Sequence, residues 1–110
     1  MNIVNEEIVI LSTCESEADA RRLASHLVER RLAACVNLLP GATSVYRWKG
    51  AVETASEWML IIKSQRRLVA AIEEEFKTVH PYEVPELIVV PIVAGSEPYL
   101  AWLRGELRPE

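Results

Sequence analysis

LAACVNLLPGATSVYRWKGAVETASEWMLIIK, residues 32–63, is the stretch that decides the fold. We interpret it as one long β-hairpin, with a first arm over residues 33–48 and a turn at Lys49-Gly50. At about 3.3 Å per residue the first arm would be roughly 50 Å long if it were straight. A compact chain of this length has a radius of gyration of only about 13 Å. Pro40-Gly41 therefore predicts a bend or bulge, since Pro removes a ladder donor and Gly tolerates the bulged conformation.

The distal half of this hairpin, residues 43–56, is expected to project beyond the local core. It carries Val45, Tyr46 and Trp48 on a ribbon with no further strand to pair with. Apolar side chains and unpaired strand edges both promote association. The hairpin therefore predicts an oligomer held together by strand pairing.

The composition restricts the class of protein. The chain has 110 residues, half of them hydrophobic, which suits one domain over residues 1–110 with a core that needs no disulfides. A net charge of −4 argues against nucleic acid and anionic membrane as partners. The start, MNIVNEE, has no basic segment followed by an apolar run, and no apolar stretch reaches about 18 residues. We therefore expect a cytoplasmic protein whose Cys14 and Cys35 are reduced thiols.

The segments around the hairpin supply the rest of a sheet and its helices. Residues 8–13 (IVILST) read as a buried central strand, and Ser16 should cap a helix with one apolar face. Ser64 is expected to cap a second helix that ends near residue 79, because Pro81 disfavours helical geometry before it. The loop HPYEVPE, residues 80–86, follows that helix.

A fourth strand and a last helix complete the chain. Residues 87–93 (LIVVPIV) predict a strand in which Pro91 argues for an edge or a bulge. Ser96 and Pro98 should begin a final short helix that stops near Gly105. The order β-α-β-β-α-β plus a helix predicts an α+β, ferredoxin-like sandwich with both main helices on one face of an antiparallel sheet. Other subunits would cover the opposite face.

Motifs for common catalytic and cofactor chemistry are missing from the sequence. It contains no GxGxxG or P-loop, no GxSxG elbow, and no HExxH or CxxC pair. Cys35 and His80 could be drawn as a nucleophile and its base, but nothing in the sequence brings them together. We expect a protein that is not an enzyme.

Cysteine and histidine residues are the candidates for binding a metal ion. Cys35 lies in a predicted strand, where a buried thiol acts as a small hydrophobe. Cys14 precedes a helix N-terminus, which can lower the pKa of a thiol, although an incidental surface cysteine is the alternative. His80 begins the proline-rich loop and is either functional or a helix cap. Copper(II) and zinc accept both ligand types, but one chain offers too few for a tight site, so neighbouring subunits or water would complete it.

The segments LAACVNLLPGATSVYRWKG, HPYEVPEL and YLAWL resemble the CutA divalent-cation tolerance family, and the resemblance runs from about Ile8 to Leu107. It implies a ferredoxin-like homotrimer whose long hairpins pair between subunits, with a shape similar to PII-type signalling proteins. It also implies copper binding and a role in copper tolerance.

The resemblance also carries over residue by residue. His80 matches the histidine of the HPY motif, which is proposed as a copper ligand in the family, and Cys35 matches the cysteine of the AAC motif. This chain has Val79 where some members have a second histidine, and Ser12 where some have a cysteine. Cys14, two residues further along the strand, is the candidate replacement. The resemblance further implies an inter-subunit cleft formed by Tyr46, Trp48, Glu57, Lys63, Tyr82 and Trp102.

The sequence thus predicts a cytoplasmic, non-catalytic homotrimer that binds a divalent metal ion, copper first, and takes part in metal tolerance. The alternative is a PII-like regulatory trimer that binds a small molecule or a protein at its inter-subunit clefts. A third interpretation is a mainly structural trimer.

Overall fold

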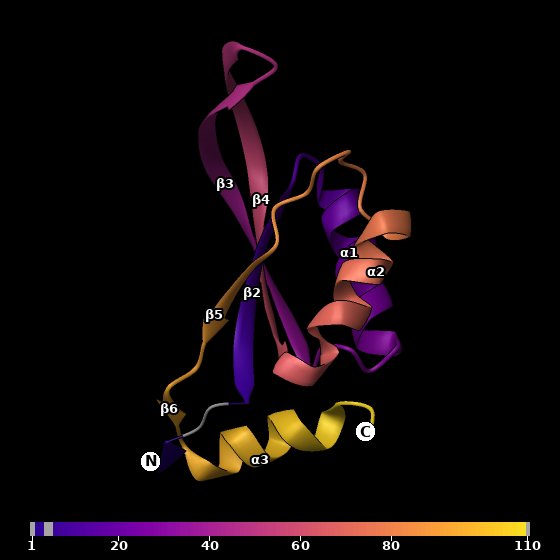
Figure 1. Cartoon of the computed structure of the whole chain (residues 1–110), viewed down its shortest axis with the longest axis vertical. Helices are drawn as coiled ribbons and strands as arrows, with labels where there is room; N and C mark the ends of the chain where they lie inside the picture. Colours follow the sequence, from indigo (N-terminus) through magenta and orange to yellow (C-terminus); the bar gives the residue numbers. More distant parts are fainter. Residues whose placement is uncertain (1, 4–5, 110) are drawn as a thin grey trace.

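A four-stranded antiparallel sheet, with two helices packed on one face, organises the computed structural model, which describes residues 2–3 and 6–109 (Figure 1). Its strands are β2 (Glu7–Cys14), β3 (Cys35–Trp48), β4 (Ala51–Gln65) and β5 (Ile88–Pro91), in the order β3-β4-β2-β5. The two helices are α1 (Glu17–Glu29) and α2 (Val69–Val79), and α2 follows the short 3-10 helix η1 (Arg66–Leu68). The short strands β1 (Asn2–Ile3) and β6 (Ala94–Gly95) pair with each other, and α3 (Glu97–Glu106) follows them.

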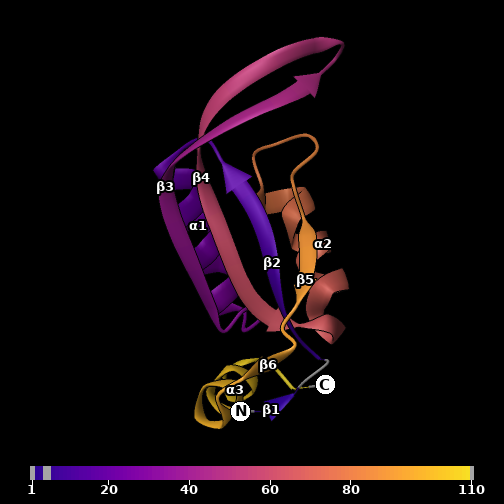
Figure 2. The same cartoon turned by 90° about the vertical axis from the view of Figure 1, so that its left-hand side faces the viewer.

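The long hairpin is confirmed, with its bulge and its turn. The register between β3 and β4 shifts between Leu39 and Ala42, and Gly41 there has φ +80°. At the turn, Lys49 has φ +50° and Gly50 has φ +83°, the two left-handed residues of a type I′ hairpin. Both arms continue past the other strands and curve over toward the side of the loop that follows α2, and the longest dimension of the chain is 44 Å (Figure 2).

The core lies between the sheet and the two main helices. Because side chains alternate along a strand, every second residue of β2 and β4 points toward α1 and α2. The largest buried side chains of this layer are Ile8, Ile10, Leu23, Leu27, Leu60, Ile62, Ile72 and Phe76. On the opposite face of the sheet the edge strand β5 leaves Ile88 and Val90 half exposed. That face is apolar in places, as the sequence predicted.

Two helix boundaries differ from the sequence prediction. Ser64 does not cap a helix; it lies in β4, fully buried, and its hydroxyl donates to the Leu32 carbonyl at 2.6 Å. β4 continues to Gln65 because that residue still pairs with β2. Gly105 does not stop the last helix, which ends at Glu106 with its C-cap at the next residue. The caps predicted for Ser16 and Ser96 are confirmed.

The last strand is shorter than predicted. β5 covers Ile88–Pro91 instead of residues 87–93, and the chain then leaves the sheet so that β6 can pair with β1. Pro91 lies in this edge strand, where a missing amide donor costs little, so the edge placement is confirmed.

α3 is fixed to the sheet by charged contacts. The Glu7 carboxylate, 2% exposed, receives the Arg104 guanidinium at 2.9 Å and the Gln65 amide at 2.7 Å. Arg31 donates to the backbone carbonyls of Gly105 and Glu106, at 2.9 Å each. These bonds hold α3 across the end of the sheet opposite to the hairpin (Figure 1).

Candidate functional site

His80 is the C-cap of α2, and its ring is buried, with 6% exposed. The backbone N–H of Tyr82 donates to Nδ1 at 3.1 Å, so Nδ1 carries a lone pair. The proton is therefore on Nε2, which donates to the Thr13 carbonyl at 3.0 Å. Burial lowers the pKa of His80, although the Thr13 bond opposes this, and the ring is neutral at pH 7. Both ring nitrogens are thus engaged within the chain.

The end of β2 brings two further polar side chains to this ring. Ser12 Oγ lies 3.3 Å and Cys14 Sγ lies 3.7 Å from His80 Nε2. Cys14 is completely buried, so it is not a surface cysteine. Burial, and then the charges of Asp19 and Glu57, raise the pKa of its thiol to about 11. The lowered pKa that the position before a helix suggested is therefore not found, because burial raises the pKa of this thiol.

Cys35 lies elsewhere. Cys14 pairs with Trp58 on β4, whereas Cys35 pairs with Lys63, further along the same strand. Cys35 is partly exposed and its nearest polar partner is Asn37 Oδ1, at 3.9 Å. Within residues 6–109, no three His, Cys, Asp or Glu side chains are grouped closely enough to hold a metal ion.

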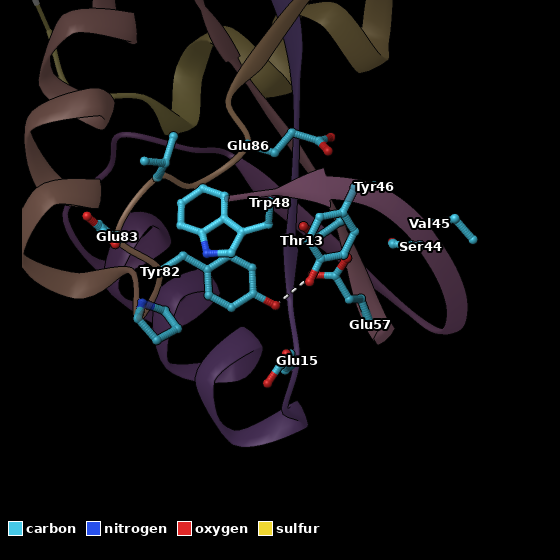
Figure 3. A pocket seen from close by; sticks show the side chains of 12 residues that line it. Thr13, Glu15, Ser44, Val45, Tyr46, Trp48, Glu57, Tyr82, Glu83 and Glu86 are labelled. Carbon is cyan, nitrogen blue, oxygen red and sulfur yellow. Dashed lines mark hydrogen bonds between the residues drawn. The ribbon is translucent and has the colours of Figure 1, made fainter. Parts of the chain in front are cut away.

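A pocket of about 700 Å³ lies next to the His80 cluster, between the distal hairpin and the loop that follows α2 (Figure 3). Aromatic rings and carboxylates make up most of its wall. The rings are Tyr46, Trp48 and Tyr82, and the carboxylates are Glu15, Glu57, Glu83 and Glu86. Among the described residues, no lysine or arginine lines it. The pocket is therefore acidic and aromatic at the same time.

Glu57 is the buried carboxylate of this pocket, with 6% exposed. The Tyr82 hydroxyl donates to its Oε2 at 2.6 Å (Figure 3). Burial raises the pKa of Glu57, but hydrogen bonds from Ser44, Tyr82 and Thr13 outweigh it and bring the pKa below its ordinary value. Burial and the Glu57 carboxylate raise the pKa of Tyr82. The pair is thus a carboxylate anion and a neutral phenol.

Comparison with known proteins places the chain in a family. The model of the CutA1 divalent ion tolerance protein family matches residues 8–106. The chain belongs to the CutA1 family. It is 48% identical to the divalent-cation tolerance protein CutA of Thermus thermophilus over 89% of this chain and 95% of that protein. It is 50% identical to human Protein CutA over 84% of this chain, but it spans only 51% of the human protein's length.

Solved CutA1 structures share the fold. The structure of the Thermus thermophilus protein aligns with a TM-score of 0.90 at 46% identity, covering 93% of this chain and 99% of that one. CutA1 from Oryza sativa aligns with a TM-score of 0.92 at 42% identity, covering 96% and 97%. The α+β fold predicted from the sequence is thus the CutA1 fold.

The residues that resemblance to the CutA family assigned to a cleft separate into two groups. Tyr46, Trp48, Glu57 and Tyr82 line the pocket. Lys63 does not line it and bonds to the Asn37 side chain. Trp102 lies on α3, with its ring centre 5.6 Å from that of Tyr99. Within one chain, therefore, only the first group forms a common site.

Sequence reasoning missed Glu15 and Thr13 as pocket residues. Glu15 directly follows the strand end that carries Cys14, and this was the one available signal. Strand ends beside a loop with a fixed backbone are common positions for functional groups. Glu83 and Glu86, which also line the pocket, belong to the HPYEVPE loop.

Proposed function

We propose that this protein binds a divalent metal ion, copper first, weakly and without catalysis, and that it takes part in metal tolerance. The observation that carries the proposal is the approach of Cys14 Sγ to His80 Nε2, 3.7 Å apart at the edge of an acidic pocket. Thiolate and imidazole are ligands that copper and zinc accept. The relatives' names, divalent-cation tolerance proteins, support the same role.

The same geometry explains why binding should be weak. A metal ion needs the lone pair of His80 Nε2, so the ring must give up its bond to the Thr13 carbonyl. Cys14 must lose a proton that its burial retains. Two donors from one chain leave the other positions to water or to a neighbouring chain. Cys35, partly exposed at a distance from this pair, is a ligand only if a second subunit brings it near.

We also propose a homotrimer with a ferredoxin-like topology. The strand order β3-β4-β2-β5, with α1 and α2 on one face, supports the topology. Val45 and Val52 on the projecting hairpin are 67% and 63% exposed, and the open face of the sheet leaves Ile88 half exposed. Apolar surface of this extent supports association. A monomer mass in light scattering at micromolar concentration would contradict the trimer.

We propose the cytoplasm as the location, and cell fractionation would test it. Relatives named as chloroplastic or periplasmic proteins show that the location varies within the family. No helix among residues 2–3 and 6–109 is long and apolar enough to cross a membrane.

Calorimetric titration of copper(II) and zinc, without oxygen, tests the metal site. We expect one saturable site per chain, weakened about tenfold or more by Cys14→Ser, which keeps the shape of the side chain but replaces a thiolate ligand by a hydroxyl. His80→Ala should weaken binding as well, whereas His26→Ala, at an imidazole bonded to Glu75, should not. Cys35→Ser shows whether assembly adds that ligand. If neither Cys14→Ser nor His80→Ala changes the affinity for the metal ion, the proposed site is wrong.

A second function is favoured by the 700 Å³ pocket, whose size suits a small organic ligand. In this reading the protein is a PII-like regulatory trimer that binds a small molecule or a protein partner, and metal binding is incidental. Ligand binding that is lost with changes at Trp48 or Glu57 but kept in Cys14→Ser would favour it.

A further inference from the structure

We propose that the pocket beside Glu57 binds an aliphatic amine that carries two or more ammonium groups. The proposal gives a ligand class to the second function above, and it does not depend on metal binding at Cys14 and His80. It rests on a buried negative charge that has no counter-charge among the described residues of one chain, on the aromatic wall, and on the spacing of the carboxylates.

The buried charge is the first step. Glu57 is 6% exposed, yet the Tyr82 hydroxyl that donates to it at 2.6 Å is neutral, and the other groups that lower its pKa are the hydroxyls of Ser44 and Thr13 and the nearby ring of His80. None of the ion pairs found within residues 6–109 includes it, and no lysine or arginine of that range lines the pocket. Buried charges in proteins are as a rule paired with an opposite charge. Within the described part of a single chain that partner is missing, and a cationic ligand would supply it.

The aromatic wall is the second step. Tyr46, Trp48 and Tyr82 line the same space as Glu57. The face of an aromatic ring, of Trp above all, attracts an ammonium group within about 6 Å of its centre. The chain already uses Trp48 in this way, because Lys49 Nζ lies 5.6 Å from the centre of its ring. Carboxylate and ring together favour an ammonium group over a neutral or anionic ligand.

The spacing of the carboxylates decides between an organic cation and a metal ion. Glu15, Glu57, Glu83 and Glu86 lie on different sides of the Trp48–Tyr82 pair in Figure 3. They do not converge on one point, and no metal-holding group of three such side chains exists in the described chain. A metal ion needs its oxygen ligands at about 2.0–2.6 Å. A chain of methylenes with ammonium groups along it matches separated carboxylates with apolar surface between them.

The test is calorimetric titration of spermidine into the full chain at low and at physiological salt. We expect one saturable site per chain. Glu57→Gln, which keeps the acceptor for Tyr82 and removes the charge, should weaken binding about tenfold or more. Trp48→Leu should weaken it roughly threefold or more. Glu74→Gln makes the same change in net charge on the exposed face of α2, where Glu74 pairs with Lys77, and should leave binding unchanged.

Three results would overturn the proposal. They are no saturable spermidine binding, equal losses in Glu57→Gln and Glu74→Gln, and Mg²⁺ binding with the same dependence on Glu57 as spermidine. The first means that the pocket does not take amines, the second that attraction is by net charge alone, and the third that the site selects a divalent ion. Circular dichroism and the melting temperature verify that each variant is folded.

The spermidine titration is independent of the copper titration. Cys14→Ser should leave spermidine binding unchanged while it weakens copper binding. If spermidine fails and copper binding depends on Cys14, the amine proposal falls and the metal function stands. If copper binding does not depend on Cys14 but spermidine binding depends on Glu57, the proposed metal site is wrong, and the regulatory function is supported with an amine as its ligand.

Discussion

His80→Ala should destabilise the protein strongly even when no metal is present. The substitution removes two hydrogen bonds, one from the Tyr82 N–H to Nδ1 and one from Nε2 to the Thr13 carbonyl. Each contributes about 1 kcal/mol net. It also empties a site that is only 6% exposed, between the rings of Phe76 and Tyr82, 5.3 and 5.0 Å away. A large-to-small change there costs about 2 kcal/mol. Together we expect a loss of about 4 kcal/mol.

The assay is guanidinium unfolding, followed by circular dichroism in EDTA at one fixed protein concentration. His80→Gln retains a donor for the Thr13 carbonyl and part of the volume, so it should recover about half of the loss. His26→Ala is the matched control. Its imidazole is bonded to Glu75 at 3.0 Å near the surface, and its removal should cost less than about 1 kcal/mol.

The reasoning is refuted if metal-free His80→Ala loses less than about 1 kcal/mol. That result would mean that the His80 ring contributes little to the packing of the loop that follows α2, and that its role is to bind a ligand. A large loss in EDTA means instead that His80 positions Tyr82, and through it the pocket, whatever metal it binds. In that case Cys14→Ser is the cleaner probe of the metal site.

Further predictions concern the hairpin, the last helix and the buried carboxylates. Gly41→Ala forces an L side chain into φ +80° and should cost about 1–2 kcal/mol in urea unfolding, whereas Gly105→Ala, inside α3 with open space around it, should stabilise by about 0.5–1 kcal/mol. The pKa of Glu57 is lowered on folding, so its contribution to stability is fully present above its ordinary pKa of 4.5 and is lost as the pH falls from there through the lower pKa of the folded state. Glu57→Gln should flatten this acid-side loss in melting temperature. Arg104→Met leaves the carboxylate of Glu7 with one partner and should lower the free energy of unfolding in urea by about 2 kcal/mol. This loss is smaller than that for breaking a fully buried ion pair, because the arginine is 38% exposed. An unchanged unfolding midpoint would contradict the anchoring of α3.

The parts of the fold that follow from local pattern could be predicted. The Pro40-Gly41 bulge and the Lys49-Gly50 turn came from residues whose backbone preferences are strong, and both are confirmed. The prediction that Ser64 caps a helix was wrong. Its residue type suits a helix cap, but continued pairing of β4 with β2 keeps it in a strand. Tertiary contacts decided that boundary, and local propensity could not reveal them.

The site depends on contacts between distant parts of the chain. Cys14 and His80 are far apart in sequence, and the fold brings the end of β2, which carries the thiol, to the C-cap of α2, which carries the ring. Glu57 meets Tyr82 for a similar reason, since the hairpin must bend toward the loop after α2. Family resemblance had grouped Glu57 and Tyr82, but it could not show that one buries a charge and that the other is its donor.

The order of the strands has a consequence for how this protein folds. The β3–β4 ribbon closes through a two-residue turn, so its contacts are local and cost little loop-closure entropy. The pairing of β2 with β5, such as Ile8 with Pro91, joins the two ends of the chain and must form late. In pulsed hydrogen exchange we therefore expect amides of the ribbon to be protected before those of β5. The ribbon would then exist before the domain is complete, and contacts between ribbons of different chains would compete with the final closure of the sheet.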